Sequence, residues 1–87
     1  MRITDSELKQ TVKILNGWMN RAGIIQEPVF LELEYAYGRP KLILRDDNGN
    51  VYKELSPRLP RPEMNRFLNG MLTAVNMITD SRNGGLK

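Results

Sequence analysis

Apolar residues near the start of the chain recur every three or four positions. This period predicts an amphipathic helix over residues 5–22, with one apolar stripe facing a core. Thr4 and Glu7 have the spacing of a capping box, in which two residues satisfy backbone N–H groups at the helix start. Gly23 supplies the left-handed residue that commonly ends a helix. The stripe consists of Leu8, Val12, Leu15, Met19 and Ala22.

From residue 29 the pattern changes to alternation of apolar and polar positions, which predicts a half-buried strand. Gly38 and Arg39 are predicted to form a two-residue turn into a second strand. This turn would place Tyr35 opposite Leu42. Because Tyr35 and Tyr37 share the parity of the apolar face, we expect both rings to close the end of the core.

The second strand is predicted over residues 41–45 and the third over residues 51–55. Between them, Asn48 and Gly49 are a strong hairpin signal because both tolerate positive φ. Two registers fit the third strand. A two-residue turn pairs Leu42 with Leu55, whereas a three-residue turn with a bulge shifts the pairing by one residue and reverses the faces.

Helical spacing returns after a proline-rich connector, residues 56–63, and predicts a second helix over residues 61–79. Gly70 within it costs roughly 1 kcal/mol relative to alanine, so we expect a neighbouring element to approach closely there. The predicted fold is an α+β domain of order α-β-β-β-α, a three-stranded antiparallel meander with both helices packed on one face. The domain covers residues 1–80, and residues 81–87 are predicted to form a flexible tail.

Composition excludes several kinds of chemistry. The 87 residues include no cysteine and no histidine, which removes thiolate and imidazole catalysis and the usual zinc sites. Paired carboxylates lie on a strand face and in a turn, without the sheltered pocket that acid/base work requires. We therefore predict no enzymatic activity, no cofactor and no metal. No apolar run is long enough to span a bilayer and no signal peptide follows Met1, so we expect a cytoplasmic protein.

Positive charge is concentrated in the last third of the chain. The net charge is +3, and residues 57–87 carry five basic and two acidic side chains. Arg58, Arg61 and Arg66 lie on the stiff connector and at the start of the second helix, where guanidinium and N–H groups bind phosphates or carboxylates. They form the first candidate site, for nucleic acid or an acidic protein. The alternative is that the prolines stiffen a loop and the arginines keep it soluble.

A second candidate site combines basic and aromatic side chains of the sheet. Arg39 and Lys41 follow Tyr35 and Tyr37 across the turn, with Tyr52 on the third strand. Basic groups beside aromatic rings hold phosphates while bases stack. The alternative is that the tyrosines belong to the core.

The opposite sheet face offers a third candidate. Phe30 and Ile43 are its large apolar residues, and they would support a homodimer or contact with another protein. The alternative is a solvated face, with Glu32 paired to Arg45 and Glu34 beside Lys41.

Two resemblances extend this interpretation. The α-β-β-β-α order resembles that of double-stranded-RNA-binding domains, although their lysine cluster at the second helix is replaced here by Pro60-Arg61-Pro62-Glu63-Met64-Asn65-Arg66. Residues 35–71 resemble small proteins encoded by bacteriophages and prophages. The matching segments are Tyr35-Ala36-Tyr37-Gly38, Ser56-Pro57-Arg58-Leu59, Glu63-Met64 and Leu68-Asn69-Gly70-Met71. This second resemblance implies an accessory protein that acts in a bacterial host cell and has no established activity.

Overall fold

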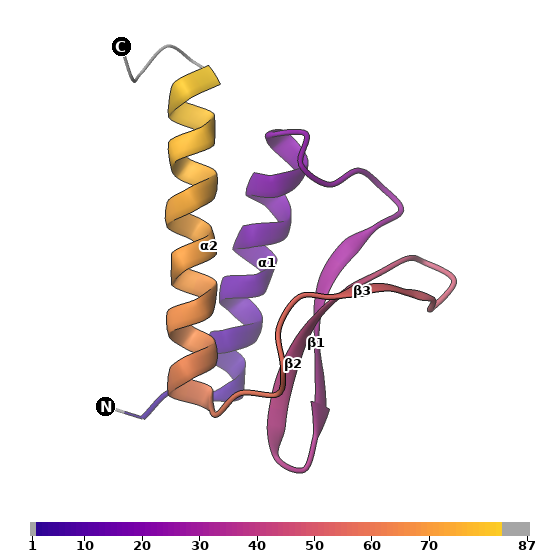
Figure 1. The fold of residues 1–87 in the computed structure, drawn as a ribbon, viewed down its shortest axis with the longest axis vertical. Coiled ribbons are helices and arrows are strands. Elements are labelled where there is room, and N and C mark those ends of the chain that lie inside the picture. Colours follow the sequence, from indigo (N-terminus) through magenta and orange to yellow (C-terminus); the bar gives the residue numbers. More distant parts are fainter. Residues whose placement is uncertain (1, 83–87) are drawn as a thin grey trace.

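A helix, three strands and a second helix follow one another along the chain, as the sequence predicts (Figure 1). The computed structural model describes residues 2–82. The elements are α1 (Asp5–Arg21), β1 (Phe30–Ala36), β2 (Arg39–Arg45), β3 (Val51–Glu54) and α2 (Arg61–Arg82). The strands form one antiparallel sheet in the order β1-β2-β3, which confirms the α+β class. Helix α2 continues to Arg82, into the predicted tail, and the rest of that tail lies outside the described residues.

Both ends of α1 have the predicted caps. The Glu7 N–H donates to Thr4 Oγ1 at 3.2 Å, and the Thr4 N–H donates to Glu7 Oε1 at 3.3 Å, which completes the capping box. At the other end Gly23 has φ of 74°. The Ile24 N–H returns to the Met19 carbonyl at 2.9 Å, the long hydrogen bond of a Schellman motif. The sequence therefore sets the length of α1 locally.

The turn between β1 and β2 differs from the prediction. Tyr37 and Gly38 have φ values of 55° and 72°, and Ala36 pairs with Arg39, so the two turn residues are Tyr37 and Gly38. The predicted turn at Gly38 and Arg39 is wrong by one position. Positive φ at both central residues is the signature of a type I′ turn, whose twist matches that of the flanking strands. The register moves by two residues, so the same face of β1 still points to the core.

The pairing of β2 with β3 combines the two predicted registers. Arg45 pairs with Val51 next to the turn, whereas Leu44 pairs with Lys53, so Tyr52 is the extra residue of a bulge. Beyond the bulge the Leu55 N–H donates to the Leu42 carbonyl at 2.8 Å, in the register expected for a two-residue turn. The bulge thus shifts the register within the strand.

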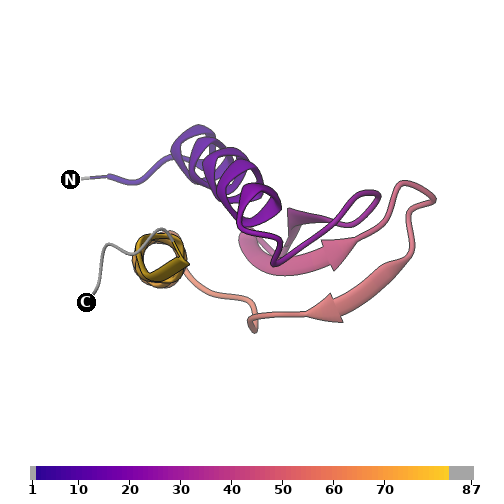
Figure 2. The same cartoon turned by 90° about the horizontal axis from the view of Figure 1, so that it is seen from above.

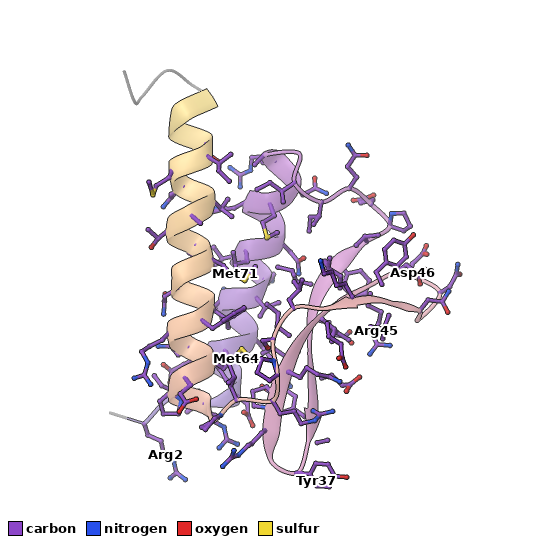
Figure 3. The ribbon with its side chains drawn as sticks, viewed as in Figure 1. Arg2, Tyr37, Arg45, Asp46, Met64 and Met71 are labelled. Atoms are coloured by element: carbon purple, nitrogen blue, oxygen red, sulfur yellow. The ribbon has the colours of Figure 1, made fainter. Side chains whose placement is uncertain are left out.

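The core lies between α1, α2 and the inner face of the sheet. Helix α1 contacts both α2 and β1, while α2 contacts α1 and β2. Viewed from above, both helices lie to one side of the sheet (Figure 2). Met64 and Met71 lie along the α2 face that is turned toward α1 (Figure 3). Each fully buried leucine stabilises the fold by about 1.5–3 kcal/mol. The side chains with at most 2% exposure in this core are Leu8, Leu15, Leu31, Leu42, Met64 and Leu68.

Two expectations about packing are wrong. Tyr37 is 96% exposed, so it is not a core residue. Gly70 has no atom within 4 Å of the place where a Cβ would be, so no element approaches it closely. Its cost to α2 is therefore not offset by packing in the described part of the chain.

One end of the molecule gathers four segments. The tip of the β1–β2 hairpin, the connector and the first turns of both helices lie at the same end, because α1 and α2 run parallel (Figure 1). Arg2 and Tyr37 project there (Figure 3). We call this the hairpin end and define it as residues 2–5, 37–39 and 58–66. Both helix dipoles direct their positive poles toward it.

Candidate nucleic-acid interface

Arg58 uses its guanidinium within the chain. Its Nη1 donates to the carbonyl oxygens of Glu34 at 3.0 Å and Arg39 at 3.4 Å, and its Nη2 donates to Glu34 Oε1 at 2.7 Å. The hydrogen bond from Arg58 lowers the pKa of the Glu34 carboxyl below its usual value. The Leu59 N–H also donates to the Pro40 carbonyl at 3.0 Å. Arg58 thus fastens the connector to the hairpin, and few of its donors remain for a ligand.

Arg61 is paired in the same way, but with the other helix. Its Nε and Nη2 donate to the two carboxylate oxygens of Asp5 at 2.7 and 3.1 Å. The hydrogen bond from Arg61 lowers the pKa of Asp5, and the hydrogen bond to Asp5 raises the pKa of Arg61. This bidentate ion pair joins the first turns of α1 and α2. Its side chains stay about 40% exposed.

Lys41 belongs to a network of charges on the outer face of the sheet. Its Nζ pairs with Glu54 and lies 3.5 Å from Glu34 Oε1. The hydrogen bond to Glu54 raises the pKa of Lys41. Arg45 Nε donates to Glu32 Oε1 at 2.8 Å, and Arg45 Nη2 lies 3.7 Å from Glu34 Oε2. Both ion pairs expected on this face are present, and Lys41 is occupied by carboxylates.

Arg39 and Arg66 differ from the other candidate cations. Both are exposed, and neither has an ion pair with any carboxylate among residues 2–79, the part of the chain whose side chains the structure describes. Arg39 follows the turn, and Arg66 lies in the second turn of α2. Arg2 adds a third exposed cation, beside Asp5 and Arg61, at the rim of a hollow of about 220 Å³. The hairpin end therefore carries unpaired positive charge next to the ion pairs of Arg58 and Arg61.

Tyr37 stands at the tip of this end. Its side chain is 96% exposed and projects from the hairpin away from the sheet (Figure 3). Its backbone is in the left-handed region, which is uncommon for a bulky side chain. The alternation of the strand placed Tyr37 in the core, and this exposed ring was missed because the turn residues were predicted one position too late.

Tyr35 is not available for stacking. The ring belongs to the inner face, and Lys9 Nζ lies 5.5 Å from its centroid. Burial, with the nearby Asp5 carboxylate, raises the pKa of the phenol to about 12. The buried hydroxyl lies near the Asp5 carboxylate, but no hydrogen bond of normal geometry joins it to any described residue. Tyr52 is 65% exposed but lies on β3. Tyr37 is therefore the ring that combines exposure with the unpaired cations.

The candidate partner surface at Phe30 and Ile43 is changed by burial. Ile43 has 0% exposure although it lies on the outer face. It pairs with Glu32 on one side and Glu54 on the other, and their ion pairs lie around it. Phe30 is half-buried beside Pro28. Ile43 therefore offers no area to a partner, and the outer face is mainly a charged network.

The acidic turn is structural. Asp46 is 9% exposed, and its Oδ1 accepts hydrogen bonds from the N–H groups of Asn48 at 3.0 Å and Asn50 at 2.9 Å. The hydrogen bond from Asn50 lowers the pKa of Asp46. These bonds form an Asx turn, which closes the β2–β3 hairpin. Within the described range, no cluster of three potential ligands could hold a metal ion.

Comparisons of the chain with protein-family models, with curated protein sequences and with solved structures give no significant match. The resemblance to phage-encoded proteins therefore stays a prediction. Neither helix, over the residues that the structure describes, is long and apolar enough to cross a membrane.

Proposed function

We propose that this chain is a non-enzymatic accessory protein of phage or prophage type that binds nucleic acid through its hairpin end in the cytoplasm of a bacterial host. The observation that carries the proposal is Tyr37, an almost fully exposed ring held in a left-handed turn beside Arg39. A bulky residue at such a position costs about 1–3 kcal/mol, and such strain is concentrated at functional sites.

Each exposed group has a defined role in this proposal. The Tyr37 ring stacks on an unpaired base, and stacking of this kind is worth about 1–3 kcal/mol for each base. Arg39 and Arg66 contact backbone phosphates, since neither is neutralised within the described chain. Arg2 supplies a further contact. The parallel helix dipoles add a favourable field for an anion at the same end.

Arg58 and Arg61 have an indirect role. Their ion pairs with Glu34 and Asp5 fix the connector and the two helix starts, so they position the binding surface and do not contact phosphate themselves. The sequence predicted that Arg58, Arg61 and Arg66 act together as ligand contacts. In this proposal only Arg66 contacts the ligand, and the other two arginines hold the surface in place. Arg39 takes the place of Arg58 and Arg61 as the second phosphate contact.

Fluorescence anisotropy with labelled 20-nucleotide single-stranded DNA, duplex DNA and duplex RNA tests the proposal. Each is titrated at low and at moderate salt. We expect strongest binding to the single strand, because its bases are free to stack on Tyr37. With two or three phosphate contacts, log K for the single strand should fall with log salt with a slope of about −1.4 to −2.1. No binding to any of the three at low salt would contradict the proposal.

Matched variants separate this surface from nonspecific charge. Tyr37→Asn should weaken single-strand binding about tenfold, while Tyr52→Asn, which removes another exposed ring, should leave it unchanged. Arg39→Ala should weaken binding and flatten the salt dependence, whereas Lys53→Ala on exposed β3 should do neither. Equal effects of each variant and its control would show that the hairpin end is not the site.

A further inference from the structure

A groove runs between α1 and the outer edge of β1, outside the hairpin end. It encloses about 400 Å³. Its floor is apolar, from Val12, Leu31 and Leu33, and Lys9 and Lys13 stand on its helical wall. This volume is in the range of pockets that hold a peptide side chain or a small ligand.

The edge of β1 in this groove has unused backbone groups. Asn16 donates to the Leu31 carbonyl at 2.9 Å and accepts from the Leu31 N–H at 2.7 Å, so the amide group of Leu31 points away from β2. In an antiparallel pair the direction of these groups alternates. Leu33 and Tyr35 therefore also direct their N–H and C=O groups outward. No residue among 2–82 bonds to them.

Asn16 shows how this edge binds a partner. Its carboxamide makes the same pair of hydrogen bonds that a residue of a neighbouring strand would make. Asn16 bonds only the backbone groups of Leu31, and the outward backbone groups of Leu33 and Tyr35 stay available to a partner. An unpaired edge of this kind is a template for an added strand.

The charge of the groove indicates which strand fits. Lys9 and Lys13 are exposed and have no ion pair with a carboxylate in the described chain. The one acidic residue of the lining, Glu32, is already paired with Arg45. The groove thus presents two ammonium groups that form no ion pair with a carboxylate among the described side chains, and Lys9 Nζ also lies 5.5 Å from the centroid of the Tyr35 ring.

We infer that this groove binds an extended acidic peptide segment, which adds as a fourth strand beside β1. Its backbone pairs with Leu33 and Tyr35, an apolar side chain covers Val12 and Leu33, and carboxylates reach Lys9 and Lys13. Addition of a strand derives affinity from backbone hydrogen bonds and specificity from alternate side chains. The hairpin end takes no part, so this site and the proposed nucleic-acid surface stand or fall separately.

The test uses a fluorescein-labelled heptapeptide of alternating valine and glutamate, with amide hydrogen exchange followed by NMR. In the free protein the Leu31 amide should exchange slowly, and the Leu33 and Tyr35 amides should exchange rapidly. We expect saturating peptide to slow exchange at Leu33 and Tyr35 at least tenfold. Binding without protection at these two amides would overturn the inference, as would no binding at millimolar protein.

Two controls address charge and backbone pairing. The double variant Lys9→Glu, Lys13→Glu should lower affinity at least tenfold, whereas Lys53→Glu should leave it within twofold. A peptide with its edge-facing amides N-methylated should not bind, because it cannot donate to β1. Unchanged affinity in either case contradicts strand addition. Protection of Leu33 that rises with protein concentration without peptide would identify a second copy as the occupant and overturn the inference.

Discussion

The Arg61 guanidinium and the Asp5 carboxylate connect the first turns of α2 and α1 through hydrogen bonds of 2.7 and 3.1 Å. These residues are 56 positions apart in the sequence, so the pair is a long-range contact that closes the fold at the hairpin end. A similar contact, Arg58 with Glu34, ties the connector to the sheet. Sequence analysis assigned Arg39, Arg58, Arg61 and Arg66 to a ligand. Arg58 and Arg61 instead hold the surface on which Arg39 and Arg66 are exposed.

Stability should fall in acid because of these carboxylates. The native pKa values of Asp5, Glu34 and Asp46 are lowered from ordinary values of 3.8, 4.5 and 3.8, so the charged forms favour the folded state. Their contribution is complete above about pH 5 and is lost as pH falls through the lowered native values. Urea denaturation between pH 2 and 7 measures this loss. Asp5→Asn should show a smaller decrease than the wild type, and an unchanged acid profile would exclude the pair.

Tyr37→Asn should stabilise the protein while it weakens binding. Asparagine adopts the left-handed conformation more readily than tyrosine, so relief of the strain should raise the free energy of unfolding by about 1 kcal/mol. Thermal and urea denaturation measure this change. Tyr52→Asn is the control, with a change within about 0.5 kcal/mol. A loss of stability in Tyr37→Asn would mean that the ring packs in the native state.

Arg66→Ala and Arg61→Ala should distinguish a residue that contacts nucleic acid from one that stabilises the fold. Arg66 has no ion pair among the described residues, so Arg66→Ala should reduce nucleic-acid affinity severalfold and leave the urea midpoint unchanged. Arg61→Ala leaves Asp5 without its partner and should lower the urea midpoint. Circular dichroism and anisotropy on the same samples make the comparison. If Arg61→Ala alone weakens binding, the arginine frame is itself the contact surface.

The fold could be predicted where local chemistry decides it. The capping box, Gly23 and the apolar periods fix the helices and the order of strands. The turn was mispredicted although the sequence contains the missing signal. The predicted register needs the N–H of residue 40 in the first ladder pair, and Pro40 has none. The observed register places Pro40 opposite Tyr35 in a pair that needs no such donor.

The candidate site was less predictable, because it depends on contacts between distant residues. Nothing near Arg61 in the sequence indicates Asp5, and nothing near Arg58 indicates Glu34. Burial of Ile43 likewise follows from charged neighbours on three strands. Sequence patterns show which residues are basic, but the tertiary structure determines which of them are already neutralised.

Gly70→Ala should stabilise α2. The site is exposed, and a Cβ there meets no atom within 4 Å, so the gain in helix propensity of about 1 kcal/mol carries no steric cost. Gly38→Ala is the contrasting variant, because its φ of 72° disfavours alanine and should make it destabilising. Urea denaturation of both variants gives the signs. A destabilised Gly70→Ala would indicate a close contact that the structure lacks.

Asn16→Ala should both destabilise the monomer and uncover more of the β1 edge. The variant removes two hydrogen bonds to the Leu31 backbone, which should lower the free energy of unfolding by about 1–2 kcal/mol. It also leaves outward-facing backbone groups unpaired at three alternate residues instead of two, and such edges pair with other strands. Sedimentation velocity should therefore detect more self-association. Asn20→Ala, an exposed change one turn later in α1, should alter neither property. Equal behaviour of the two variants would show that Asn16 does not protect this edge.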